Sequence, residues 1–296
     1  MLTSEIHIRD PFVVPDPSTK SYFLTGTTGH ATWGGPGPGF DVYRSTDLET
    51  WDGPIPCFRP GHDFWATRNF WAPEIHRYGG RTYLLASFKA DRCYRGTQIL
   101  AAEEPVGPFS TLTEGPITPA DWECLDGTLH IDAGGAPWIV FCHEWVQIHN
   151  GAIVALPLTP DLKRAAGRPI HLFNASEAPW VRPIRGWPAE GSGFPCYVTD
   201  GPYLYRTRAD VLLMLWSSFG DGGYTLGVAR SASGTVTGPW VQEPEPLWTR
   251  DGGHGMVFRT FEDRLMLTFH QPNETPLERP VFIEIEDTGS GLQVKA

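Results

Sequence analysis

One opening recurs five times along this chain of 296 residues: a polar residue in a turn, followed by a strand of alternating apolar residues. The five opening residues are Asp10, Glu74, Asp126, Asp200 and His254, so four of them are acidic. Their spacing is irregular, between 52 residues (126−74) and 74 residues (200−126), which is typical of repeat architectures. Because such a repeat returns equivalent positions to one axis, we expect these five side chains to gather in one pocket.

Short runs with a period of two residues occur throughout the chain, whereas a helical period is hard to find. Three of the clearest runs are SYFLTGT (21–27), RTYLLASF (81–88) and VLLMLWSS (211–218). With 33 Gly and 28 Pro between them, these runs indicate an all-β protein. Five units of about 59 residues (296/5) suit blades of up to four antiparallel strands, because radial repetition leaves only short, protected sheet edges. We therefore predict a five-bladed β-propeller that occupies 1–296 as a single domain, with the openers at one mouth of the central channel.

Composition excludes several classes of function. The formal net charge of −11 offers no basic surface for a phosphate backbone, so we expect no nucleic-acid partner. The longest purely apolar run, 211–216, is far shorter than the roughly 20 residues that cross a bilayer, so we expect no membrane span. The amino terminus lacks the features of a secretory signal, which predicts a cytoplasmic protein. The five cysteines form no CxxC motif and are expected to be reduced thiols.

Any one acidic opener is explained equally well as a turn residue, because Asp, Gly and Pro are favoured in turns for backbone reasons. Acidic residues at four of five equivalent positions are harder to explain in this way. Carboxylates crowded into one mouth repel one another and lose hydration, which costs free energy and is typical of functional sites. We therefore interpret the openers as the residues of an active site.

The 12 tryptophans are more numerous than core packing usually needs. We expect most in the core and some at the mouth, where an aromatic face contacts the C–H groups of a sugar. The candidates for that role are Trp33, Trp65, Trp71, Trp145 and Trp216. Separated carboxylates beside aromatic rings suit the hydrolysis of a glycosidic bond, in which one group protonates the leaving oxygen and another activates water. Openers on non-adjacent blades favour the wide carboxylate separation that gives inversion.

Five segments of the chain together resemble glycoside hydrolase family 43. They are RDPFVV, WAPEIHRYGGRTYLLAS, LDGTLHIDAGGAPWIVFCHEW, TDGPYLYRT and GGHGMVFR. Members of this family are five-bladed propellers that act on glycans containing arabinose, xylose and sometimes galactose. The resemblance implies that Asp10 is the general base, that Asp200 is the general acid, and that Asp126 orients the acid and raises its pKa.

Asp200 departs from the family pattern, which has glutamate at this position. Aspartate is one methylene shorter, so its carboxyl stands back by roughly 1–1.5 Å from the glycosidic oxygen, and catalysis is sensitive to such misplacement. Either the site has adapted to Asp200, or another carboxylate such as Glu144 supplies the proton, or the activity is lost or changed.

The remaining candidates are less specific. We expect substrate contacts from Trp71, Glu74, Glu144, Trp145, Trp216 and Arg279. His254 matches a family position that faces a bound calcium ion or water, so the resemblance allows a structural Ca²⁺ in the channel; a channel histidine without metal is the alternative. No cofactor is required. The stretch 173–195, with Trp180 and Trp187, is expected to close over the site or to pack between subunits.

We therefore predict an inverting exo-glycosidase that acts on plant-type oligosaccharides, with α-L-arabinofuranosidase as the leading activity. The alternatives on the same scaffold are β-xylosidase and exo-β-galactosidase, because pocket loops rather than the carboxylates select the sugar. A sugar-binding propeller that has lost catalysis is the alternative of a different class. The expected partner is an oligosaccharide substrate, and the sequence makes no prediction of the oligomeric state.

Overall fold

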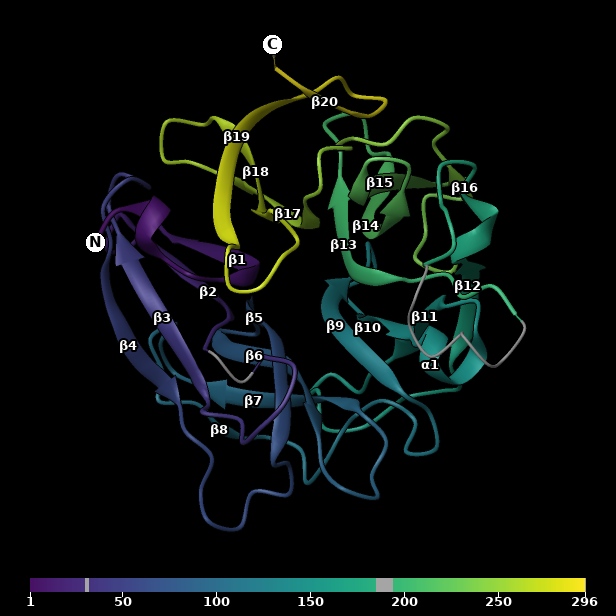
Figure 1. Ribbon diagram of the computed structural model, residues 1–296. Coiled ribbons are helices and arrows are strands. Elements are labelled where there is room, and N and C mark those ends of the chain that lie inside the picture. The colour runs from purple at the N-terminus through teal and green to yellow at the C-terminus, as the bar shows by residue number, and fades with distance from the viewer. Residues whose placement is uncertain (30–31, 185–193, 296) are drawn as a thin grey trace.

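The computed structural model describes residues 1–29, 32–184 and 194–295. Its strands form five antiparallel sheets of four strands, arranged as blades around a ring (Figure 1). Blades 1 and 2 contain β1 (Arg9–Asp16), β2 (Ser21–Thr27), β3 (Phe40–Ser45), β4 (Asp52–Phe58), β5 (Arg68–Tyr78), β6 (Arg81–Lys89), β7 (Gly96–Ala102) and β8 (Ser110–Thr111). Blade 3 contains β9 (Cys124–Ile131), β10 (Pro137–His143), β11 (Ala152–Pro157) and β12 (Ile170–Asn174).

The two C-terminal blades follow the same plan. They contain β13 (Asp200–Arg206), β14 (Leu212–Gly220), β15 (Gly223–Ser231), β16 (Trp240–Gln242), β17 (Gly253–Arg259), β18 (Leu265–Gln271), β19 (Arg279–Asp287) and β20 (Leu292–Val294). The helical segments are short: η1 (Thr3–Glu5), α1 (Trp145–Ile148) and η2 (Ala175–Glu177). The prediction of an all-β, five-bladed β-propeller is therefore confirmed.

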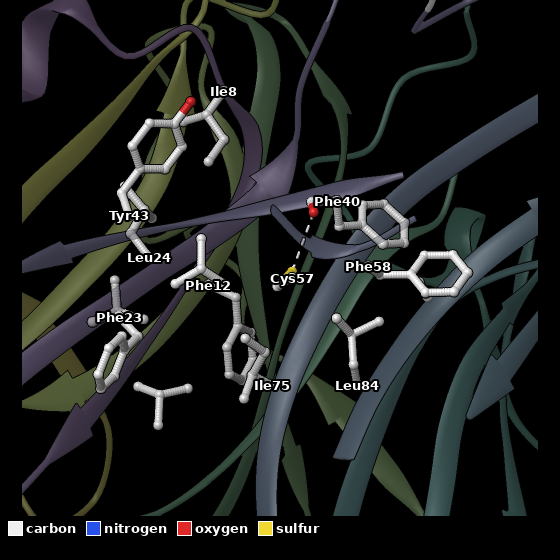
Figure 2. Close-up of a cluster of buried hydrophobic side chains, with 14 of the residues drawn as sticks. Ile8, Phe12, Phe23, Leu24, Phe40, Tyr43, Cys57, Phe58, Ile75 and Leu84 are labelled. Carbon is white, nitrogen blue, oxygen red and sulfur yellow. Dashed lines mark hydrogen bonds between the residues drawn. The ribbon is translucent and has the colours of Figure 1, made fainter. Parts of the chain in front are cut away.

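The first strand of each blade is the innermost one. Strands within every sheet follow the order of the chain or its reverse, and β1 contacts both β5 and β17, the first strands of the neighbouring blades. These strands are largely apolar because both of their faces are covered by adjacent blades, as the burial of β1 shows. Figure 2 shows this packing between blades 1 and 2, where Phe12 of β1 lies near Ile75 of β5.

Each innermost strand contains a β-bulge close to its N-terminal end, and β5 has an additional register shift between Arg68 and Trp71, before the bulge that begins at Ala72. Extra residues of the first strand interrupt its pairing with the second, and regular pairing resumes shortly afterwards. The first residue of each bulge has a positive φ, between 44° and 55°; in chain order these residues are Asp10, Ala72, Asp126, Gly201 and His254. A bulge bends the strand and redirects its side chains, so the same local distortion is repeated at five positions around one mouth.

The ring closes between blades 5 and 1 through the N-terminal segment. The amino group of Met1 donates to the carbonyl oxygen of Trp51, and η1 contacts β19 of blade 5. The Trp51 ring stacks on Phe282 of β19 with the ring centroids 6.0 Å apart. The guanidinium of Arg279 donates to the carbonyl oxygen of Ser4 at 2.8 Å. The segment before β1 therefore holds the first blade against the last.

None of the five cysteines is joined to another. Across the part of the chain that the structure describes, no helix is long and apolar enough to span a membrane.

Candidate active site

The bulges bring three of the five predicted residues to one mouth of the propeller. Asp10, Asp126 and His254 each occupy the first bulge position, and their side chains are close to one another. A positive φ is unfavourable for residues other than glycine, and such backbone strain is concentrated at functional sites. Finding Asp, Asp and His at three of these positions therefore supports a functional role.

The prediction that Glu74 lies at the mouth and contacts the substrate is wrong, because the bulge of blade 2 begins at Ala72. Glu74 stands two residues later, where pairing with Leu85 resumes. Its side chain is buried and forms an ion pair with Nε2 of His76 at 2.8 Å. Glu74 is thus a paired residue of the packed strand and is not available as a substrate-binding group.

Asp200, the predicted opener of blade 4, lies one residue before the first bulge position. Gly201 occupies the bulge of blade 4, and Asp200 is the residue before it. The equivalent residues of blades 1 and 2 are Arg9 and Trp71, which are likewise the last paired residues before their bulges. Residues from two strand positions therefore face the mouth: the first bulge residue and the residue before it. Asp200 occupies the second of these positions, as Arg9 and Trp71 do.

A closed ring of hydrogen bonds fixes the five bulges. Each backbone N–H at the first bulge position donates to a side chain of the preceding blade, at distances between 2.7 and 3.1 Å. The bonds run from Asp10 to Nδ1 of His270, from Ala72 to Oγ1 of Thr27, from Asp126 to Oγ of Ser87, from Gly201 to Oδ2 of Asp126, and from His254 to Oγ of Ser217.

The bond from Gly201 differs from the other four because its acceptor is itself a mouth residue. In blade 3 the second-strand residue near the equivalent position is Cys142, opposite Leu125, and sulfur is a weak hydrogen-bond acceptor. The N–H of Gly201 instead binds the Asp126 carboxylate at 3.0 Å. Asp126 is therefore tied to the residue that follows Asp200, which links the two carboxyl groups through the backbone.

Asp10 is held ionised by the groups around it. Thr27 Oγ1 donates to its Oδ2 at 2.7 Å, and Nδ1 of His254 lies 3.1 Å from its Oδ1. Burial alone would raise the pKa of Asp10, but His254, His270 and Arg9 outweigh it and hold the pKa below its usual range. Asp10 is therefore present as the ionised carboxylate.

His254 is the cation of the cluster. Its Nδ1 also lies 3.7 Å from Oδ2 of Asp126, so one ring nitrogen is shared between two carboxylates. Burial opposes the charged ring, but Asp10, Asp126 and Asp200 outweigh it and raise the pKa of His254 to about 10. Gly201 makes room for this ring, since a Cβ there would lie 2.7 Å from Cδ2 of His254.

Asp126 and Asp200 favour the protonated form. Burial raises the pKa of Asp200 to about 6; the charges of Asp10 and Glu144 add to this, while His254 and a hydrogen bond from Tyr224 oppose it. Burial also raises the pKa of Asp126, and the charge of Asp200 adds to the shift. The mouth therefore pairs one ionised carboxylate, Asp10, with two that hold a proton more readily, which is the division of roles that acid–base catalysis requires.

Glu144 and Trp71 belong to a second cluster beside the carboxylates. Glu144 is buried and forms an ion pair with Arg95, whose guanidinium lies 4.3 Å from the centroid of the Trp71 ring. Trp71 meets the exposed Trp33 edge to face, with centroids 5.6 Å apart. Trp33 and Trp71 thus form an aromatic wall. The carboxylate of Glu144 is already paired with the guanidinium of Arg95.

Of the other residues predicted to contact the substrate, Trp216 and Arg279 have other partners, and Trp145 lies at the start of α1. Trp216 is completely buried in the core against Phe173 and Trp180, so its prediction as a substrate-binding residue is wrong. Arg279 donates to the backbone of the N-terminal segment and so serves the closure of the ring. Trp145 is half-buried at the start of α1, and its role stays a prediction.

The prediction that 173–195 covers the site or packs between subunits falls partly outside the described residues, as Trp187 does. The described Trp180 is buried against Trp216. A pocket of about 220 Å³ has a lining that includes Arg9, Thr27, Thr28, Thr32, Thr275 and Glu278. Of these residues, Thr27 donates a hydrogen bond to Asp10, but the carboxylates themselves are not part of the lining.

The fit to a metal ion is poor. Over residues 1–29, 32–184 and 194–295, no three His, Cys, Asp or Glu side chains converge to hold a metal. Nδ1 of His254 faces Asp10 and Asp126, and calcium prefers oxygen ligands. These side chains do not fit a directly bound Ca²⁺.

Three residues that the sequence did not single out complete the site. Thr27 donates to Asp10, Tyr224 donates to Oδ2 of Asp200 at 2.9 Å, and His270 accepts the N–H of Asp10. Thr27 and His270 are the second-strand residues that pair with the residue before the bulge in blades 1 and 5. Counting the paired strand backwards from each opener would have found these two, whereas no local pattern marks Tyr224.

Comparisons with known proteins identify the family of this chain. The model of the family described as Glycosyl hydrolases family 43 matches residues 4–287. The solved endo-arabinase from Bacteroides thetaiotaomicron VPI-5482 is 44% identical, with a TM-score of 0.89, over 97% of this chain and 96% of that chain. The extracellular endo-alpha-(1->5)-L-arabinanase 1 of Bacillus subtilis (strain 168) is 22% identical over 259 residues, which are 83% of this chain and 71% of that protein. The solved α-L-arabinofuranosidase from Lactobacillus brevis shares the fold, with a TM-score of 0.72 at 15% identity over 98% of this chain and 96% of that chain.

The family match covers nearly the whole chain, so the resemblance read from the sequence is confirmed. Two of these relatives are named as endo-acting enzymes, which supports glycoside hydrolysis but not the exo mode that the sequence predicted. The chain belongs to glycosyl hydrolase family 43 and is an inverting glycoside hydrolase.

Proposed function

We propose that the protein is an endo-acting α-1,5-L-arabinanase in which Asp10 is the general base and Asp200 the general acid. The observation that carries the catalytic assignment is the electrostatic contrast at the mouth. Asp10 has its pKa held low by His254, whereas burial raises the pKa of Asp200 to about 6. The proposed substrate rests on the likeness to the endo-arabinase at 44% identity, and the arabinanase from Bacillus subtilis points the same way.

The proposed reaction is a single displacement. Asp10 accepts a proton from water while the water oxygen forms a bond to the anomeric carbon. The bond from this carbon to the glycosidic oxygen breaks, and the proton of Asp200 passes to that oxygen. Attack from the face opposite to the leaving group inverts the anomeric centre. Asp126 orients Asp200 through the N–H of Gly201, and His254 stabilises the anionic form of Asp10.

The aromatic wall gives the sugar a place to bind. Trp33 is 62% exposed, lies beside Trp71, and donates from Nε1 to Oγ1 of Thr275, a residue of the pocket lining. Stacking on such rings suits the C–H faces of arabinofuranose units. The guanidinium of Arg9 lies 4.9 Å from the centroid of the Trp33 ring and extends this surface toward Asp10.

The mode of attack is tested by the products formed from linear α-1,5-arabinan. Endo action lowers the viscosity early, before many reducing ends appear, and releases oligosaccharides of several lengths. Exo action releases arabinose from the start with little early loss of viscosity, and this result would contradict the proposal. Nitrophenyl α-L-arabinofuranoside, β-D-xyloside and β-D-galactoside serve as comparison substrates, because preferred cleavage of one of them would support the corresponding exo-acting alternative.

A further inference from the structure

Tyr224 contacts the proposed general acid from a position that is fixed on several sides. Its hydroxyl, on β15, donates to Oδ2 of Asp200 on β13 at 2.9 Å. The side chain is buried, and its ring stacks on the imidazole of His270 with the centroids 5.5 Å apart and the planes 22° apart. His270 in turn accepts the backbone N–H of Asp10. Tyr224 therefore lies between the proposed acid and the group that anchors the proposed base.

The protein makes room for this ring. A Cβ at Gly253, the residue before the bulge of blade 5, would lie 2.6 Å from Cε1 of Tyr224. The backbone N–H of Tyr224 donates to Oδ1 of Asp251 at 3.1 Å, which fixes the start of β15. Phe219 packs against the ring with the centroids 5.5 Å apart. The phenol oxygen consequently has little freedom to follow a carboxyl group that moves.

The protonation states of this group are defined by their neighbours. Nδ1 of His270 accepts a hydrogen bond, so the proton of the neutral ring is on Nε2, which lies 3.2 Å from Oδ1 of Asn273. Burial lowers the pKa of His270 to about 4. Burial also raises the pKa of Tyr224 well above its ordinary value, and the charge of Asp200 adds to the shift. Tyr224 is thus a neutral hydrogen-bond donor across the pH range in which Asp200 titrates.

We propose that Tyr224 is a positioning residue that adapts this site to an aspartate acid: it holds Oδ2 of Asp200 and leaves Oδ1 to carry the transferable proton. Aspartate places its carboxyl about 1–1.5 Å nearer to the backbone than glutamate does, because it lacks one C–C bond. A glutamate at the same backbone position would extend past the fixed phenol oxygen and lose this bond. Asp200 and Tyr224 therefore form a matched pair.

The matched pair makes a specific prediction for pH dependence. The groups that face Asp200 are Tyr224, His254, Asp10 and Glu144, and Asp200 also acts on Asp126. The bond from Tyr224 stabilises the ionised form of Asp200, so its removal favours the protonated form. In Tyr224→Phe we expect the alkaline limb of kcat/KM to move up by about 0.5–1 pH unit, which corresponds to one neutral hydrogen bond. We also expect kcat to fall by about tenfold or more, because the carboxyl is no longer positioned.

The test compares four proteins: wild type, Tyr224→Phe, Asp200→Glu and the double variant. If the pair is matched, Asp200→Glu is slower than wild type, and Tyr224→Phe changes kcat much less when it is added to Asp200→Glu than when it is added to wild type. An equal effect in both backgrounds, or a gain of activity in Asp200→Glu, would overturn the proposal. An alkaline limb that does not move in Tyr224→Phe would also overturn it.

Tyr203→Phe is the matched control. Tyr203 lies on β13 with Asp200, and its hydroxyl donates to the carbonyl oxygen of Val257 at 2.9 Å, away from the carboxylates. We expect this variant to lose a similar buried hydrogen bond without any shift of the alkaline limb. A shift of equal size in Tyr203→Phe would mean that the limb reports general loosening of the fold, which would contradict a role specific to Tyr224.

This inference rests on the proposed acid role of Asp200 but not on the sugar. If wild type cleaves a glycoside other than arabinan, the proposed substrate fails, and the same comparison is made on the glycoside that it does cleave. If wild type cleaves none, the carboxyl pKa of Asp200 is read by ¹³C NMR in wild type and in Tyr224→Phe, with Asp200→Asn for assignment. A higher pKa in Tyr224→Phe would support the pair, and an unchanged pKa would overturn it.

Discussion

At the scale of single residues, the site separates carboxylates by what surrounds them. Asp10 contacts a protonated histidine and the hydroxyl of Thr27, whereas the half-buried Asp200 accepts a hydrogen bond from a neutral donor, Tyr224. The sequence predicted Asp10, Asp126 and Asp200 because each precedes a strongly apolar strand. It could not predict Tyr224, because the importance of this residue comes from its contact with Asp200 on another strand rather than from any local pattern.

The difference between the lowered pKa of Asp10 and the raised pKa of Asp200 predicts an acidic pH optimum for hydrolysis. As the proposed general acid, Asp200 must be protonated, and burial raises its pKa to about 6, so kcat/KM should fall as the pH rises through about 6. Asp10 must be ionised, and His254 helps to hold its pKa below the ordinary value of 3.8, so loss of activity on the acid side should begin only below that value. Rates measured from about pH 3.5 to about pH 8 on arabino-oligosaccharides cover the alkaline limb and the start of the acid side. A rate that stays constant from about pH 5 to about pH 8 would contradict the assignment of Asp200.

At the scale of strands, the β-bulge explains why some openers were predicted correctly and others were not. Asp10, Asp126 and His254 are themselves the first bulge residues, whereas blade 2 has Ala72 there and blade 4 has Gly201. A strand pattern with a period of two does not reveal where an extra residue is inserted, so the sequence points to the acidic residue nearest to each strand. In blade 2 that residue is Glu74, which lies two residues beyond the start of the bulge.

The bulge of blade 4 gives a sharp test of this geometry. Gly201 has a φ of 51°, and an added Cβ would contact the ring of His254 at 2.7 Å. We expect Gly201→Ala to displace His254, to lower kcat by about 100-fold, since misplacement of about 1 Å has effects of that size, and to lower the free energy of unfolding by more than about 1 kcal/mol.

Kinetics and urea denaturation measure these two effects. Gly115→Ala is the control, because nothing lies within 4 Å of a Cβ at that position. Equal behaviour of the two variants would show that the bulge conformation does not position His254.

At the scale of the whole molecule, composition and periodicity were sufficient to predict five blades. The 3.6-residue period is weak, and strands bounded by Gly and Pro recur in five units, which leaves few other architectures. The closure of the ring was not predictable, because the segment 1–8 carries no strong pattern of its own. Its role depends on contacts with Trp51 and with β19.

Trp51 tests that closure. It is fully buried, stacks on Phe282, and donates from Nε1 to Oγ1 of Thr3 at 2.9 Å. We expect Trp51→Ala to lower the free energy of unfolding by about 3–5 kcal/mol, as measured by chemical denaturation. Trp33→Ala, which removes an exposed ring, should cost much less. Similar costs for the two variants would argue against a closure that depends on the N-terminal segment.

Asp10 is proposed to activate water for an inverting attack on α-1,5-linked arabinose. The most direct measurement is NMR-monitored digestion of α-1,5-arabinohexaose by wild type and by Asp10→Asn, with attention to the anomeric proton that appears first. We predict that wild type releases oligosaccharides whose new reducing end is first β, and that Asp10→Asn binds the substrate but shows almost no turnover. Initial appearance of the α anomer, or full activity of Asp10→Asn, would contradict the account.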